Sequence, residues 1–369
     1  MTKPKSGVLD LLRLLPVGGP AICNVSVTNA CNATCDFCNF AHDKGFVKHR
    51  TWLDADRFTE ALTLLRARAN VRFVTFMGGE PLLHPRIAEM ARTATGMGIQ
   101  PTLVTNGWLL PGKVDALADA GITTLFTSID SHDPAVHEKN RGLKGVCERI
   151  RGANAHLARR GVTPIASVAM TRLVTDYPAL GHFLKALGFA AVTFSYPRKA
   201  PLGSSSLVWS EDSDLVDFSP RELLAAFDAV DELRKIIPVH NPQASIADMR
   251  RRLRGEAERF HCLAGYKYFY LDWNYDLWRC EDWKAPICPV WEFEPGKTIR
   301  DGCQACTTDC YRDASVMLTF AVALGDTFAR LSEGRIGAAA AALVDRRNAA
   351  SLGAVIAHGS RLARLAGVG

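Results

Sequence analysis

Short apolar runs rich in β-branched residues alternate with amphipathic segments between residues 24 and 197. We predict that the runs are strands buried on both faces, because each is a nearly continuous apolar stretch. The segments between them carry apolar residues three and four positions apart and end in a glycine or a turn, which is typical of helices. The predicted strands cover residues 24–29, 71–79, 101–107, 123–130, 164–170 and 190–197.

Repeated strand and helix units imply right-handed crossovers and a parallel sheet. We therefore expect an α/β fold: a partial (βα)6 TIM-like barrel, a small C-terminal cysteine-rich β-hairpin domain and a helical tail. Functional groups in such folds lie at the carboxyl ends of the strands. Polar signatures occupy those ends here, as "MGGEP" at 77–81, "TNG" at 105–107 and "SID" at 128–130.

The chain divides at shifts in composition. After Pro197 a turn-rich segment at 198–214 is expected to form a surface loop, and a helix with good capping residues follows at 219–237. The predicted parts are an N-terminal helical extension at 1–20, the barrel at 21–240, the cysteine-rich domain at 241–313 and the helical tail at 314–369.

Composition and charge narrow the class of protein. With 369 residues, 48% of them hydrophobic, the chain can bury a substantial core. A net charge of +6, spread along the chain, gives no reason to expect nucleic acid. The N-terminal apolar patch lacks a cleavage signal, and the run at 314–324 is too short to span a bilayer, so we expect a cytoplasmic protein.

The eleven cysteines suggest metal binding, because the cytoplasm keeps thiols reduced. Cys31, Cys35 and Cys38 follow the first predicted strand with C-x3-C-x2-C spacing. Such a loop can wrap three thiolates around zinc or one corner of an iron–sulfur cluster. A fourth ligand is either Cys23 or His42, or the fourth position is open to a substrate or cofactor.

The open position is the reading we favour, because the motifs resemble those of radical S-adenosylmethionine (SAM) enzymes. The resemblance rests on the cysteine spacing, on an aromatic residue just before the third cysteine, and on the order of the glycine-rich and SID motifs. It implies that Cys31, Cys35 and Cys38 bind a 4Fe-4S cluster. The residues that it assigns to the SAM pocket are Phe37, Gly78, Gly79, Glu80, Asn106, Ser128 and Asp130.

The resemblance also implies a reaction. SAM bound at the open iron is cleaved by one electron, and the resulting 5'-deoxyadenosyl radical abstracts hydrogen from an unknown substrate, which is a small molecule, a lipid or a peptide. An electron donor such as flavodoxin or ferredoxin is the implied partner. The alternative, from a different class, is a non-catalytic protein that binds iron–sulfur or zinc on the same fold.

A second cysteine group lies near the end of the barrel. A β-hairpin is predicted for "YKYFYLD" and "DLWRC", with "WNY" at the turn, and it brings Cys262 close to Cys280. The arrangement resembles the auxiliary-cluster domain called twitch, a short form of the SPASM domain, although Tyr275 stands where that family usually has glycine. The candidate ligands of the auxiliary 4Fe-4S cluster are Cys262, Cys280, Cys303 and Cys306, with Cys310 competing for the fourth place.

Other readings of these regions stay open. Zinc in a tetrathiolate site explains the same second group, and a cluster there either transfers electrons or binds substrate. Cys23, Cys147 and Cys288 receive no role. Weak candidates for substrate contact are His84, Arg141, Tyr196, Arg198 and Lys199.

The tail also has two readings. It is either a helical cap that packs on the barrel or on another copy of the chain, or a basic amphipathic surface that contacts lipid. Six arginines, no lysine and two acidic residues occur from Arg330 onward.

Overall fold

Nine strands form a single mixed sheet in the computed structural model, which describes residues 13–42, 48–197 and 213–365. The strand order is β6-β5-β4-β3-β2-β1-β7-β8-β9; the pairs from β6 to β7 in this order are parallel, whereas β8 is antiparallel to both β7 and β9. The strands are β1 (Ala21–Ser26), β2 (Val71–Met77), β3 (Gln100–Thr105), β4 (Thr124–Ile129), β5 (Thr163–Ala169), β6 (Ala191–Ser195), β7 (Tyr268–Leu271), β8 (Asp276–Trp278) and β9 (Cys288–Pro289).

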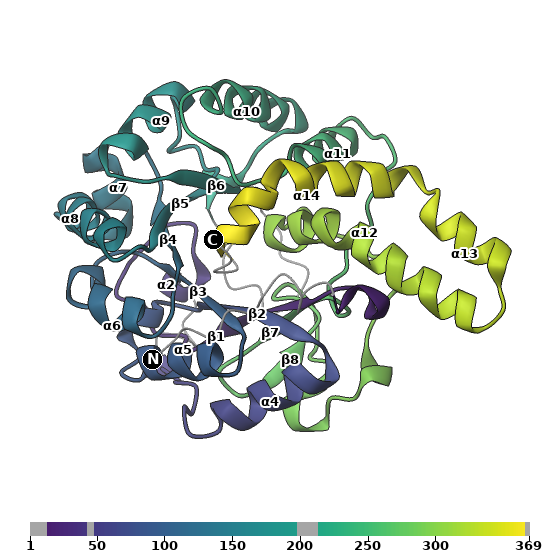
Figure 1. Ribbon diagram of the computed structural model, residues 1–369. Helices are drawn as coiled ribbons and strands as arrows, with labels where there is room; N and C mark the ends of the chain where they lie inside the picture. The colour runs from purple at the N-terminus through teal and green to yellow at the C-terminus, as the bar shows by residue number, and fades with distance from the viewer. Residues whose placement is uncertain (1–12, 43–47, 198–212, 366–369) are drawn as a thin grey trace.

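Each of the six predicted strands is present, and helices cover the outer side of the curved sheet (Figure 1). The sheet is open, as expected for a partial barrel. The helices between the strands are α2 (Asn39–His42), α4 (Phe58–Arg68), α5 (Ile87–Gly96), α6 (Val114–Asp119), α7 (Pro134–Arg141), α8 (Val146–Arg159), α9 (Tyr177–Ala186), α10 (Pro220–Leu233) and α11 (Gln243–Leu253). Residues 1–12 of the expected N-terminal extension and most of the expected loop at 198–214 lie outside the described residues.

Alternate residues of each strand face the helices or the interior of the barrel. Phe76 and Leu103 pack in the outer core with Phe58 of α4 and Met90 of α5. The opposite face of the strands carries half-buried polar residues in matching register. These residues are Thr75 beside Thr102, and Ser128 beside Ser167, which is beside Thr193. The sheet therefore presents a hydroxyl-bearing inner face.

The predicted hairpin is β7 and β8, which pair antiparallel. β7 also pairs in parallel with β1, the strand that leads into the first cysteine loop. The cysteine-rich segment is thus joined to the barrel through the same sheet.

The tail consists of α12 (Asp309–Ser332), α13 (Ile336–Leu343) and α14 (Arg346–Leu365), so its first helix begins five residues before the expected Ala314. α12 contacts the other two helices as well as α11 and β6, and the turn from α12 to α13 stands out from the body (Figure 1). By length and composition alone α12 is apolar enough to cross a membrane; the 314–324 run considered in the sequence is only part of it.

Candidate functional site

The first cysteine loop leaves the carboxyl end of β1 and leads into α2. Cys35 is buried, whereas Cys31 and Cys38 are half-buried. Burial raises the pKa of each thiol, and the charge of Cys38 raises the pKa of both Cys31 and Cys35 further. The structure therefore brings the three predicted thiols within electrostatic reach of one another.

Neither of the two suggested fourth ligands is placed with these three thiols. Cys23 lies elsewhere in the core, and His42 contacts a backbone carbonyl. Cys23 is fully buried in the outer core, on the helix-facing side of β1. The His42 Nε2 atom lies 2.9 Å from the carbonyl oxygen of Cys35. Within the described residues, no three His, Cys, Asp or Glu side chains are placed to hold a single metal ion.

The two glycines after β2 lie against the segment that precedes Cys31. Gly78 has a φ of 124°, and a Cβ on Gly79 would lie 2.1 Å from the carbonyl oxygen of Ala30. The Gly79 and Glu80 amides donate to the carbonyl oxygens of Thr28 and Ala30 at 2.9 and 2.8 Å. The two glycines thus let the segment after β2 pack closely against the segment before Cys31. Their contact with SAM stays a prediction.

Glu80 is fully buried and ties the ends of β2 and β3 together. Its Oε1 accepts hydrogen bonds from the Leu82 amide at 3.0 Å and the Thr105 hydroxyl at 2.6 Å, and its Oε2 accepts from the Asn106 amide at 2.7 Å. Burial raises the pKa of Glu80, while these three donors lower it. The Asn106 side chain continues the network, because its Nδ2 donates to Asn32 in the cysteine loop at 2.8 Å.

Asp130 forms a buried ion pair. Arg141 donates to both of its carboxylate oxygens, at 2.9 and 2.6 Å, and Asn140 donates to one of them at 2.8 Å. Although burial raises the pKa of Asp130, the Arg141 guanidinium outweighs that effect and holds it well below its usual range. Both oxygens are thus engaged by the protein, whereas Ser128 lies half-buried on the inner face. Binding of the SAM ribose by either residue stays a prediction.

The segment that carries Arg141 also holds the cysteine loop. The Thr34 amide donates to the Arg141 carbonyl oxygen at 3.0 Å, and the Asp36 amide donates to Asn140 at 3.2 Å. Phe37 is buried among Ile129 and other apolar residues of the second core. The middle of the loop is therefore fixed to the end of α7 by its backbone and to the core by its aromatic side chain.

The sequence predicted Arg141 only as a weak candidate for substrate contact. The position of Arg141 beside the cysteines was not predicted. The sequence did contain a signal for the ion pair: only one turn and the short helix α7 separate Asp130 from Arg141. The other weak candidates within the described residues, His84 and Tyr196, are also buried. Arg198 and Lys199 lie outside the described residues.

The second cysteine group gathers four of its five members. The Cys262 amide donates to the Cys303 carbonyl oxygen at 3.1 Å. Burial raises the pKa of Cys262 to about 12, and the charges of Cys306 and Cys303 raise it too. The pKa of Cys280 is raised by burial and, among other neighbours, by Cys306 and Cys262. Cys262 is therefore within electrostatic reach of Cys280, Cys303 and Cys306.

Cys310 packs against the same apolar cluster but has a different electrostatic surrounding. After burial, the neighbours that raise its pKa are the carboxylates of Glu281, Asp309 and Asp282. Carboxylates, and not the other cysteines, are thus the leading charged neighbours of this thiol.

Tyr275, which stands where the resemblance led us to expect glycine, has a φ of 67°. This is the left-handed region, where glycine is favoured. The Tyr275 ring packs on Trp291 at a centroid distance of 5.0 Å, and its hydroxyl donates to the Asp54 carbonyl oxygen. Although the residue is tyrosine and not glycine, its backbone therefore has the conformation that glycine favours.

The segment that contains the first cysteine loop matches a known protein family. Residues 25–174 match the model of the Radical SAM superfamily, a span that contains the loop, the glycine-rich segment and the Asp130–Arg141 pair. The match covers this span and not the whole chain. Members of that family use a 4Fe-4S cluster and SAM, and the three clustered thiols of this chain are a donor set that fits such a cluster.

Curated relatives match part of this chain. The GTP 3',8-cyclase of Chlorobaculum tepidum is 39% identical over 152 residues, which cover 41% of this chain and 44% of the relative. The AdoMet-dependent heme synthase of Oleidesulfovibrio alaskensis is 28% identical over 171 residues, which cover 45% and 43%. The GTP 3',8-cyclase of Listeria welshimeri is 28% identical over 229 residues, covering 59% and 66%. The chain thus spans less than two thirds of these relatives.

Solved structures share the fold. Streptococcus suis SuiB bound to precursor peptide SuiA has a TM-score of 0.56 at 14% identity, covering 82% of this chain and 72% of that one. Native anSMEcpe with bound AdoMet has a TM-score of 0.51 at 14% identity, covering 94% and 99%. These likenesses show the fold alone, a mixed α/β architecture.

Proposed function

We propose that this protein is a radical SAM enzyme whose catalytic cluster is bound by Cys31, Cys35 and Cys38. The observation that carries the proposal is the gathering of these three thiols at the carboxyl edge of the sheet, inside the span that matches the Radical SAM superfamily. When bound, the cluster and SAM supply one-electron reductive cleavage of SAM and hydrogen abstraction from a substrate.

The chain's own residues hold this site in place. Gly78 and Gly79 admit the backbone of residues 28–30, and Glu80 joins the ends of β2 and β3. The half-buried hydroxyl of Ser128 and its neighbours on the inner face offer hydrogen bonds to a polar cofactor. Apolar residues around Phe37 and Phe40 exclude water from the loop, which favours chemistry that water would quench.

An auxiliary 4Fe-4S cluster is the second part of the proposal, with Cys262, Cys280, Cys303 and Cys306 as its ligands. Their mutual electrostatic effects support this set, and the carboxylate surroundings of Cys310 leave that thiol outside it. Four protein ligands would complete the cluster, so its role is electron transfer. A flavodoxin or ferredoxin supplies the electron that starts the reaction, in the cytoplasm, where the eleven thiols stay reduced.

The deciding experiment is anaerobic. The protein is reconstituted with iron and sulfide, dithionite and SAM are added, and 5'-deoxyadenosine is quantified. The Cys31→Ala variant is compared with Cys147→Ala, which removes a buried thiol on α8 that belongs to neither group. We expect product from the wild type and from Cys147→Ala, and none from Cys31→Ala.

A wild type that binds iron and SAM but yields no 5'-deoxyadenosine contradicts the enzyme proposal and supports a non-catalytic binding protein. Metal analysis of the anaerobically purified protein addresses the second site, because zinc in place of iron contradicts the auxiliary cluster.

A further inference from the structure

Exposed apolar side chains are concentrated in the helical tail. Ile336, Val344 and Ile356 are 72%, 79% and 71% exposed, and each would ordinarily be buried. Outside the tail, the large apolar residues exposed in the described chain are Val17 and Trp52. The complete set within the tail is Phe328, Leu331, Ile336, Leu343, Val344, Leu352 and Ile356. A cluster of this kind marks an interaction surface.

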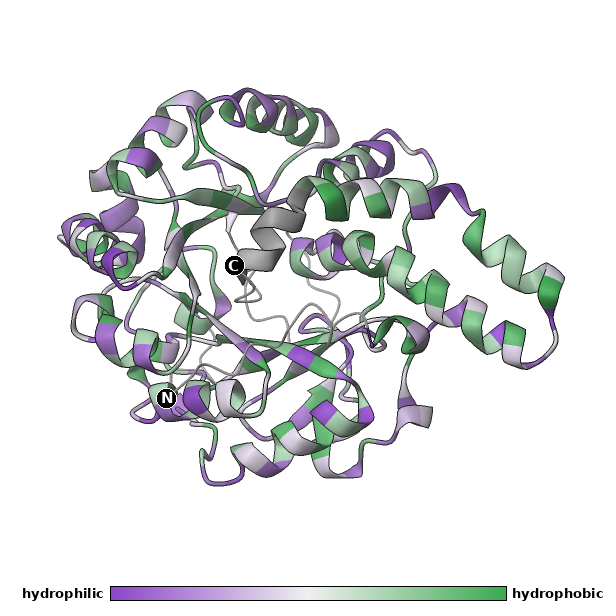
Figure 2. Cartoon of the chain, in the orientation of Figure 1, coloured by the Kyte–Doolittle hydropathy of each residue, from purple (hydrophilic) through white to green (hydrophobic). Residues whose placement is uncertain are grey.

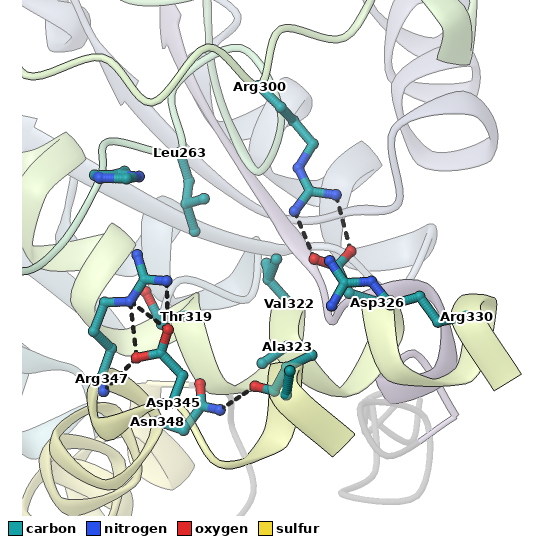
Figure 3. A pocket seen from close by; sticks show the side chains of 13 residues that line it. Leu263, Arg300, Thr319, Val322, Ala323, Asp326, Arg330, Asp345, Arg347 and Asn348 are labelled. Atoms are coloured by element: carbon teal, nitrogen blue, oxygen red, sulfur yellow. Dashed lines mark hydrogen bonds and ion pairs between the residues drawn. The ribbon is translucent and has the colours of Figure 1, made fainter. Parts of the chain in front are cut away.

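Polar side chains of the tail point the other way, toward the inside. Thr327, Asn348 and Ser351 are buried, and Asn348 donates to the Ala342 and Leu343 carbonyl oxygens at 2.7 and 3.0 Å. A cavity of about 340 Å³ lies between the tail and the segments around Leu263 and Arg300 (Figure 3). Val316, Val322 and Ala354 of the tail are also buried, as in a helix packed on a soluble core, so the exposed apolar residues form a second set that the body does not cover.

Ion pairs line this inner cavity. Arg300 donates to both carboxylate oxygens of Asp326 at 2.9 and 2.8 Å, which ties α12 to the body (Figure 3). Asp345 is held by Arg347 in the turn before α14. The acidic groups of this part of the tail are therefore already engaged on the inner side, and the outer side keeps its apolar residues.

The charge around the apolar surface is positive. Arg335 and Arg346 are exposed at the start of α13 and of α14, beside Ile336 and Val344. Glu333 is paired with Arg335 at 3.1 Å. From Arg330 onward the sequence has six arginines, no lysine and two acidic residues. Arginines beside exposed apolar side chains complement an anionic lipid surface.

We propose that the tail, α12 to α14, binds the surface of an anionic membrane through the exposed apolar residues from Phe328 to Ile356. The tail stands out from the body at the α12 to α13 turn (Figure 1), and hydrophobic stretches follow along α13 (Figure 2), so this part reaches the interfacial region without displacing the barrel. A second copy of the chain is the less favoured occupant, because a two-fold interface would place the same arginines against each other. This inference does not rest on the radical SAM chemistry.

The test is flotation of the full chain with vesicles of phosphatidylcholine alone or with one third phosphatidylglycerol, at low and high salt. We expect the protein to float with the anionic vesicles and to be released at high salt. The double variant Ile336→Glu, Val344→Glu should lower the partition coefficient at least about tenfold. Val17→Glu, which charges an exposed apolar residue outside the tail, should leave it unchanged.

A second pair, Arg335→Glu with Arg346→Glu, keeps the apolar residues and should weaken binding to anionic vesicles alone. Its matched control is Lys235→Glu, at an exposed lysine after α10. No flotation of the wild type overturns the proposal. So does equal flotation with both vesicle types, or a concentration-dependent dimer that the double variant abolishes, which would assign the surface to a second copy.

Discussion

The two cysteine groups are built in opposite ways. The first takes its thiols from eight consecutive positions, Cys31 to Cys38, and fixes them from three sides through Gly79, Glu80 and the end of α7. The second gathers thiols spread from Cys262 to Cys306, and its segments are joined by a few contacts. In the first group the loop itself carries the geometry, while in the second the geometry depends on how distant segments fold together.

Contacts in the second group show this dependence. Arg279 is buried and donates to both carboxylate oxygens of Asp301, at 2.6 and 2.8 Å, which joins the strand before Cys280 to the segment before Cys303. The Ile299 amide donates to the Gly265 carbonyl oxygen at 2.8 Å. Damage to any one of these segments is expected to disperse the group.

The largest expected effect is on iron content, and it distinguishes the proposed ligand Cys306 from the neighbouring Cys310. Cys306→Ser should remove one cluster and lower the iron content from about eight to about four atoms per chain, because a fully ligated 4Fe-4S cluster takes four cysteines. Cys310→Ser should keep about eight. Iron and sulfide analysis with electron paramagnetic resonance measures both, and equal loss in the two variants would show that Cys310 is a ligand.

Gly79→Ala tests the support of the first group. Its Cβ would meet the Ala30 carbonyl oxygen at 2.1 Å, so the backbone before Cys31 must shift. We expect the free energy of unfolding to fall by about 3 kcal/mol. Gly152→Ala on α8 is the control, because no atom lies within 4 Å of its added Cβ and alanine should stabilise the helix by about 0.5–1 kcal/mol. Denaturant unfolding measures both, and similar stabilities would refute the clash.

Glu80→Gln alters the buried network of the same site. The Glu80 carboxylate accepts three hydrogen bonds, whereas the amide NH2 of glutamine would face one of these donors with another donor. We therefore expect the free energy of unfolding to fall by about 2 kcal/mol. Glu89→Gln on the exposed side of α5 breaks a solvent-screened surface pair with Arg86 and should change the free energy of unfolding far less. A loss as small as that of the control would mean that Glu80 is not what holds β2 to β3.

Tyr275→Phe is expected to have the smallest effect, and it acts in the second region. Phenylalanine keeps the ring contact with Trp291 but removes the hydroxyl that donates to Asp54, so the free energy of unfolding should fall by about 1 kcal/mol. Iron content should not change. Loss of iron in this variant would show that the hairpin turn is coupled to the cluster more tightly than the contacts indicate.

Sequence patterns predicted the barrel better than the sites. Strands β1 to β6 are short apolar runs between helix-forming segments, and local residue preferences suffice to find them. The hairpin of β7 and β8 was found in the same way. The pairing of β7 with β1 was not, because no pattern in either strand names its neighbour across the sheet.

Within the first site, the spacing of Cys31, Cys35 and Cys38 predicted that the thiols gather. The partners of Asp130 and Glu80 could not be predicted, because a carboxylate in a sequence does not show whether its oxygens face a ligand or the protein. The structure places the Asp130 oxygens against Arg141 and Asn140, and those of Glu80 against the end of β3.

The sequence predicted the tail either as a helical cap or as a basic amphipathic surface. The alternation of apolar residues gave no hint that Ile336 and Val344 would face outward while Asn348 and Ser351 face inward. The ion pair of Arg300 with Asp326 accompanies that orientation, and it joins α12 to a segment 26 residues earlier, which no local pattern predicts.

The position of β1 in the sheet has a consequence for synthesis of the chain. β1 is the first strand of the described chain, yet it lies inside the sheet, and its second edge is paired by Tyr268–Leu271. At roughly 5–20 residues per second, the ribosome needs about 10–50 s to reach β7 after β1 has been made. For that interval the strand leading to Cys31 has one unpaired edge, and the finished sheet covers it only once β7 has been made.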